Sequence, residues 1–234
     1  MSNKKTIYTK RMKVADLLAS DGNLLSILQR LDIRLGFGEA TIADLCARYG
    51  ISAELFIMIC NIYSYHDYVP QVESLAEKDI ESITAYLRAS HRYYTRGCFP
   101  AIHNSIHRLV NELDNVSRRV IDKFYDDYDN EVNNHFSYEE DVVFPYIESL
   151  LNNKEKSDDK YNIRQFGHNH SNINEKLNDL KNIIIKYLDE KYSLPLRFEL
   201  LKEIYIVEED LRKHSLIENK LLIPLVENLE NSHE

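Results

Sequence analysis

Residues 135–150 read HFSYEEDVVFPYIESL, and residues 214–229 read HSLIENKLLIPLVENL. The second stretch repeats the first after 79 residues, because 214 − 135 = 79, with His, Glu and Pro at matching places. Each copy carries the pattern His-x3-Glu, which puts an imidazole and a carboxylate one turn apart on a single helix face. An internal repeat of this kind predicts two long helices of one design.

Apolar residues accompany both pairs at helical spacing. In the last helix they step by three or four residues and comprise Leu200, Ile204, Val207, Leu211, Leu221 and Leu225. Around the first pair they comprise Ile121, Tyr125, Tyr128, Val132, Val142 and Tyr146. We expect four long helices, at about 78–112, 115–152, 161–191 and 194–230. Four amphipathic helices joined by short loops predict an all-α fold, an antiparallel up-down four-helix bundle. Each Pro of the repeat is read as a kink or break at the bundle end beyond the His-Glu pair.

Two further histidines share the spacing of the repeat. His91 precedes His135 by 44 residues, and His170 precedes His214 by the same 44. His168 is two residues from His170 and therefore about 200° away on a helix, so we expect it to be solvated or to support a ligand without binding the metal. His103 and His107 form another i, i+4 pair, but they lie about 18 Å or more along the helix from His91, and a surface position is favoured.

The repeated positions predict a metal site. A buried carboxylate costs several kcal/mol unless a partner compensates it. One His-x3-Glu pair alone is more often a surface pair or a hydrogen-bonded histidine of the core. The predicted ligands are His91, His135, Glu139, His170, His214 and Glu218. Four imidazoles and two carboxylates suit two first-row transition-metal ions bridged by the two Glu side chains. No cysteine lies near them, which argues against an iron–sulfur cluster or a thiolate zinc site, and spacing alone leaves iron, manganese and zinc open.

Composition narrows the remaining function classes. A net charge of −9 argues against nucleic acids and anionic membranes as partners. No apolar run approaches the roughly 20 residues of a membrane helix, and the basic start lacks a signal-peptide core. Three scattered cysteines show neither a disulfide framework nor a CxxC pair, so we expect a cytoplasmic protein. We expect a small helical domain at 1–66, a linker at 67–77 and the bundle at 78–234.

The segment TIADLCARYGISAELFIMICNIY, residues 41–63, resembles a helix-turn-helix with Gly50 at the turn. Its second helix has no Lys or Arg and is mostly apolar, whereas a DNA-reading helix presents basic and polar side chains. We therefore expect it to be a packing or partner surface.

The six positions resemble the hemerythrin-like (HHE) cation-binding family, whose pattern is H…HxxxE…H…HxxxE with Phe-Pro after the first HxxxE. Here Phe144-Pro145 and Ile223-Pro224 follow the two pairs, and the likeness covers about 78–230. Together with the segment VADLLASDGNLLSILQRLDIRLGFGEATIADLCARYGIS, the chain looks like the iron–sulfur cluster repair (RIC, ScdA-type) di-iron proteins. That group usually carries adjacent cysteines where this chain has Gly36-Phe37-Gly38-Glu39, so a role of that cysteine pair does not carry over.

The resemblance implies an oxo-bridged centre of two Fe ions that responds to nitric oxide and oxidants. It implies a part in repairing iron–sulfur clusters damaged by oxidants or nitric oxide, with NO, O2 and damaged iron–sulfur proteins as partners of a monomer or homodimer. Whether the protein is an enzyme is left open. The alternatives are an O2/NO-binding sensor or NO-detoxifying di-iron protein, a peroxide-handling enzyme of the ferroxidase kind, which more often uses Glu-x-x-His pairs, and a purely structural bundle.

Overall fold

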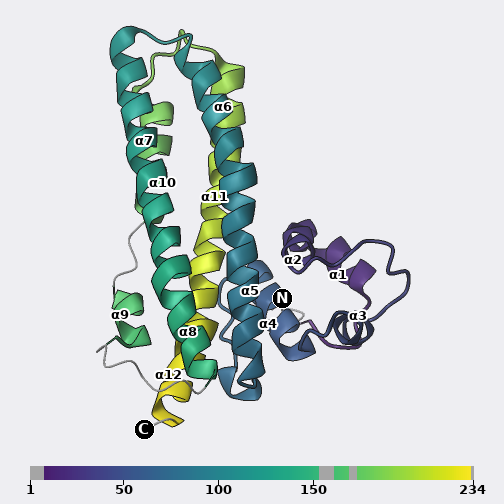
Figure 1. Cartoon of the computed structure of the whole chain (residues 1–234). Helices are drawn as coiled ribbons and strands as arrows, with labels where there is room; N and C mark the ends of the chain where they lie inside the picture. The colour runs from purple at the N-terminus through teal and green to yellow at the C-terminus, as the bar shows by residue number, and fades with distance from the viewer. Residues whose placement is uncertain (1–7, 153–160, 169–172, 233–234) are drawn as a thin grey trace. The chain divides into compact units, whose positions relative to one another are not determined.

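The computed structural model describes residues 8–152, 161–168 and 173–232, and within these ranges every regular element is a helix. Figure 1 shows the course of the chain. Contacts divide it into two units: unit 1 comprises Met1–Ala89 and Ser215–Glu234, and unit 2 comprises Ser90–His214. The expected division at 67–77 remains a prediction.

Unit 1 begins with short helices. They are α1 (Val14–Ser20), the 3₁₀ turn η1 (Gly22–Leu24), α2 (Leu25–Arg30), α3 (Ile42–Tyr49) and α4 (Ala53–Ser64), followed by the 3₁₀ turn η2 (Val72–Ser74) and by α5 (Lys78–Tyr93), whose last residues belong to unit 2. The unit also holds the end of the chain, with the π-helical segment η6 (Glu218–Leu222) and α12 (Ile223–Ser232).

The turn between α3 and α4 has the local chemistry of a helix-turn-helix. Thr41 and Asp44 form a capping box at the start of α3, Gly50 ends it with φ of 67°, and Ser52 caps α4. Eight of the twelve residues of α4 are buried, which leaves little of this helix to face a DNA groove. Among the described residues no single helix is long and apolar enough to cross a membrane, although α3 and α4 together, bent by 118°, pass that test.

Unit 2 is a helical bundle. Its helices are α6 (Phe99–Val110), α7 (Asn115–Tyr138), α8 (Phe144–Leu151), α9 (Ile163–His168), α10 (Ile173–Asn182) and α11 (Leu194–Ile217), with the π-helical segments η3 (Tyr94–Cys98), η4 (Glu139–Val143) and η5 (Ile183–Tyr187) between them. The long helices α6, α7, α10 and α11 run side by side in alternating directions (Figure 1). This confirms the expected all-α fold built on a helical bundle.

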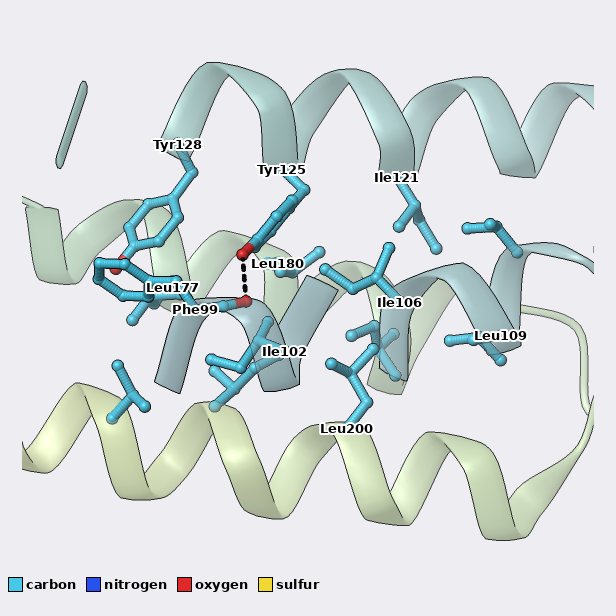
Figure 2. Packing of buried hydrophobic residues seen from close by; sticks show 14 of the residues in the cluster. Phe99, Ile102, Ile106, Leu109, Ile121, Tyr125, Tyr128, Leu177, Leu180 and Leu200 are labelled. Carbon is cyan, nitrogen blue, oxygen red and sulfur yellow. Dashed lines mark hydrogen bonds between the residues drawn. The ribbon is translucent and has the colours of Figure 1, made fainter. Parts of the chain in front are cut away.

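One apolar core joins these four helices. Figure 2 shows Ile106 of α6 facing Ile121 of α7, and Ile102, one turn away, on the side of Tyr125. Leu180 of α10 and Leu200 of α11 belong to the same core. The Tyr125 hydroxyl donates a hydrogen bond to the backbone oxygen of Phe99, 3.0 Å away, so this buried phenol is satisfied inside the core. The predicted apolar stripe of the second helix therefore faces this core as far as Val132, and that of the last helix as far as Leu211. Val142, which was predicted on the same stripe, is exposed instead.

Three of the π-helical segments lie directly before an Xaa-Pro pair. Pro100, Pro145 and Pro224 each stand at the second residue of the helix that follows such a segment. In η4 the Phe144 N–H donates to the Glu139 oxygen five residues back, and in η6 the Ile223 N–H donates to Glu218 in the same way. Proline lacks an N–H and clashes with the carbonyl four residues before it, and a π turn accommodates both effects without ending the helix. The helices continue past each Pro, so a wide turn takes the place of the expected kink or break.

Candidate metal centre

Glu139 occupies the junction between α7 and the π-helical segment η4. Its side chain is fully buried, and the Nε2 atom of His135, one turn earlier on α7, lies 2.7 Å from its Oε1 atom. The i, i+4 spacing of the motif therefore places imidazole and carboxylate together, as the sequence predicts.

His91 approaches the same carboxylate from α5. Its Nε2 atom lies 2.7 Å from Glu139 Oε2, although the two residues are far apart in sequence. Its other ring nitrogen, Nδ1, lies 2.8 Å from Oε1 of Glu140, whose side chain reaches partly to solvent. The ring of His91 is thus held between two consecutive carboxylates of one segment.

His214, on α11, completes the group within unit 2. Its Nε2 atom lies 3.9 Å from Glu139 Oε2, and one ligand atom each of His91, Glu139 and His214 lies within 4.8 Å of the other two. Glu218 is fully buried and follows His214 by one turn, at the start of η6. His170 lies outside the described residues.

The electrostatics of Glu139 favour its charged form. Burial by itself raises the pKa of this carboxyl, but the imidazoles of His135, His214 and His91 lower it more. The net result is a pKa well below the ordinary value of a glutamate, so the carboxylate is available as an anionic ligand.

The nitrogen and oxygen atoms of this group are arranged to bind a metal ion and not to hydrogen-bond with one another. His91 Nε2 and both oxygens of Glu139 are buried, and within the part of the chain that the structure describes none of them has a hydrogen-bond partner. Buried polar atoms are nearly always hydrogen-bonded, so their convergence here calls for another partner. Imidazole nitrogen and carboxylate oxygen are donors that first-row transition metals prefer.

Aromatic rings surround the group and restrict water. The ring of Phe136 stacks on His91 with a centroid distance of 4.2 Å, and Phe144 lies 5.7 Å from the same ring. Tyr94 is fully buried, meets the His214 ring edge-on at 5.7 Å, and donates a hydrogen bond to Asp210, 2.5 Å away.

Tyr94 and Tyr138, which both lie near ligand positions in the sequence, have different surroundings in the structure. Tyr94 contacts His214, whereas the Tyr138 hydroxyl lies 3.5 Å from that of Tyr161. The contribution of Glu140 was not expected. The only signal for it was a second acidic residue directly after the His-x3-Glu motif, and a regular α-helix would turn that residue about 100° away from Glu139.

Comparison with known proteins agrees with this geometry. No curated protein and no solved structure matches the chain. The family model described as the hemerythrin HHE cation-binding domain matches residues 82–226, which is more than half of the chain and contains every predicted metal ligand. With a buried His and Glu group able to hold a metal at the motif positions, the chain belongs to the hemerythrin family of HHE cation-binding domains.

Proposed function

We propose that the protein holds two iron ions with His91, His135, Glu139, His170, His214 and Glu218. The observation that carries this proposal is the buried meeting of His91, Glu139 and His214, in a chain whose His-x3-Glu motif recurs after 79 residues. Two separate helices supply one motif each, which matches a two-ion centre with a carboxylate from each copy.

Iron is the ion proposed, because imidazole and carboxylate donors suit it and because the family binds cations with this pattern. A pair of iron ions would supply redox chemistry and a binding position for a small diatomic molecule. The chain's own contribution is to hold the His91 ring through Glu140, to keep Glu139 ionised, and to limit water with Phe136 and Tyr94.

We further propose that this centre serves the repair of iron–sulfur clusters damaged by oxidants or nitric oxide, in the cytoplasm. Support comes from the likeness of the N-terminal segment to the small domain of the repair proteins. The cysteines of unit 1 do not stand in for the missing pair: burial raises the pKa of Cys46 to about 12, and it raises the pKa of the Cys60 thiol well above its ordinary value. Thiols this hard to ionise are poor nucleophiles, so the repair role is assigned to the metal centre.

Anaerobic purification followed by metal analysis is the first test. About two irons per chain are expected, and zinc alone at equal occupancy would end the redox proposal. The loaded protein should then reactivate an iron–sulfur enzyme damaged by NO. A Glu139→Ala, Glu218→Ala double variant should not, whereas a Glu73→Ala, Glu190→Ala control, which removes two exposed carboxylates, should act like wild type.

The same experiment separates the alternative function, an O2/NO-binding sensor or NO-detoxifying protein. A sensor should bind NO reversibly, with an optical change and no reactivation of the damaged enzyme. A detoxifying protein should consume NO over many turnovers. Either outcome would contradict the proposed repair function, while the proposal of an iron centre would still hold.

A further inference from the structure

We propose a second metal site, on the outer face of unit 2, that binds one divalent transition-metal ion of the zinc class. Its ligands are His103 and His107 on α6 and Asp122 and Asp126 on α7. This site is separate from the HHE centre and does not depend on the function proposed for that centre.

The spacing of these residues favours chelation. His103 and His107 are an i, i+4 pair, and so are Asp122 and Asp126, so each pair lies along one face of its helix. The two helices are consecutive, pack against each other, and are joined by residues 111–114 alone, which makes them antiparallel neighbours. Two histidines at i, i+4 on one helix commonly supply two of the ligands of a zinc site, and a carboxylate is a common third ligand.

The structure places both pairs around one hollow. The hollow measures about 40 Å³, and its lining consists of His103, Ile106, His107, Asp122, Tyr125 and Asp126. This volume is close to that of one or two water molecules, a scale that suits a single ion with a bound water. The ring of His103 lies 5.7 Å from that of Tyr125, the buried residue at the base of the hollow.

The charges around the hollow favour a cation. Among the described residues the carboxylates of Asp122 and Asp126 have neither an ion pair nor a hydrogen bond. A neighbouring hollow of about 300 Å³ shares His103 and Tyr125 and adds Asp129. Burial first, and then the charges of Asp129 and Asp126, raise the pKa of Tyr125, so the negative potential reaches the base of the site. A divalent ion bound in the hollow would offset the repulsion among these negatively charged carboxylates.

The second site differs from the buried centre in rigidity. His103 and His107 are exposed, as the sequence led us to expect, and Nδ1 of His107 lies 3.3 Å from the Asn111 side-chain nitrogen. Among the described residues, the ligand atoms that lie within 4.8 Å of one another are those of the buried centre and not those of His103 and His107, so binding here requires rotation of exposed side chains. The ion held here should therefore exchange more readily than one in the buried centre.

The test uses the full chain as purified, dialysed against Zn²⁺ and analysed for bound zinc. Wild type should bind one zinc more per chain than a His103→Gln, His107→Gln double variant, with equal iron in both. Asp126→Asn should weaken the additional zinc, whereas Asp127→Asn, which removes the same charge from the next, exposed residue of α7, should not. Equal zinc counts in wild type and the double variant would overturn the proposal.

A second measurement needs no variant. Paramagnetic Co²⁺ added to the wild-type protein should shift or broaden the imidazole NMR signals of His103 and His107 at the first equivalent, and a visible absorption typical of four-coordinate cobalt should appear. Imidazole signals that stay unchanged up to several equivalents would also overturn the proposal.

Discussion

Glu140 and His91 meet with Oε1 2.8 Å from Nδ1, on the ring edge opposite the contact between His91 and Glu139. A carboxylate behind a metal-binding imidazole fixes the ring orientation and increases its basicity. We expect Glu140→Gln to lower the affinity for metal by about 10–100-fold. Competition with a coloured chelator measures this change.

The control for this variant is the next residue. Asp141→Asn removes the same charge from an exposed position of η4, so it should leave the metal affinity near that of wild type. If the two variants bind metal equally well, Glu140 does not orient His91.

Metal removal should lower the stability of the protein. An ion that binds only the folded state adds about 2.7 kcal/mol when its free concentration is 100 times its dissociation constant. A chelator should therefore lower the thermal midpoint of wild type, as followed by circular dichroism. The Glu139→Ala, Glu218→Ala variant should show no such shift, and an equal shift in both proteins would speak against a metal at these residues.

Asp114 caps the start of α7, where it accepts hydrogen bonds from the backbone N–H groups of Val116 and Ser117 and from the Tyr192 hydroxyl. Hydrogen bonding by Tyr192 first, and then by Ser117 and Val116, lowers the pKa of Asp114 below its ordinary value of 3.8. A depressed pKa contributes stability that is present above pH 3.8 and is lost as the pH falls through the lower, folded-state pKa.

Asp114→Asn tests this dependence on pH, since Asn also caps helices but does not titrate. Denaturant unfolding should find wild type more stable than the variant near neutral pH, with the difference shrinking below about pH 3.8. A difference that stays constant across this range would contradict the assignment.

Two isoleucines of α11 give a matched test of the core. Ile204 is fully buried among the bundle helices, whereas Ile206 is 64% exposed. We expect Ile204→Ala to reduce the free energy of unfolding by about 2–5 kcal/mol and Ile206→Ala by no more than about 0.5 kcal/mol. Urea unfolding of both variants checks this, and similar losses would mean that α11 presents a different face to the core.

The sequence predicted the bundle because its signals are periodic and repeated. Apolar steps such as Leu200, Ile204 and Val207 fixed the inner face of the last helix, and the 79-residue repeat indicated where His135 and Glu139 had a counterpart. Four amphipathic helices with short connections leave few arrangements, so the fold class followed directly.

The contact between His91 and Glu140 could not be predicted from the sequence, and the reason is physical. Helix periodicity assumes about 100° per residue, and that angle turns Glu140 away from the face of Glu139. The π-helical segment η4 starts at Glu139, and the extra residue per turn changes the local direction of the side chains. Proline near a motif signals some irregularity, but its form, a wide turn or a break, depends on the packing around it.

The π-helical segments before Pro145 and Pro224 also determine which sequence changes the metal centre can tolerate. A π turn holds one residue more than an α turn, so we expect deletion of one residue there to restore a regular turn instead of rotating everything downstream by 100°. We therefore expect changes beyond each proline to leave the orientation of the ligands before it unaltered. Accordingly, α8 or α12 can be redesigned to bind a new partner without changing the His-x3-Glu motif that precedes it.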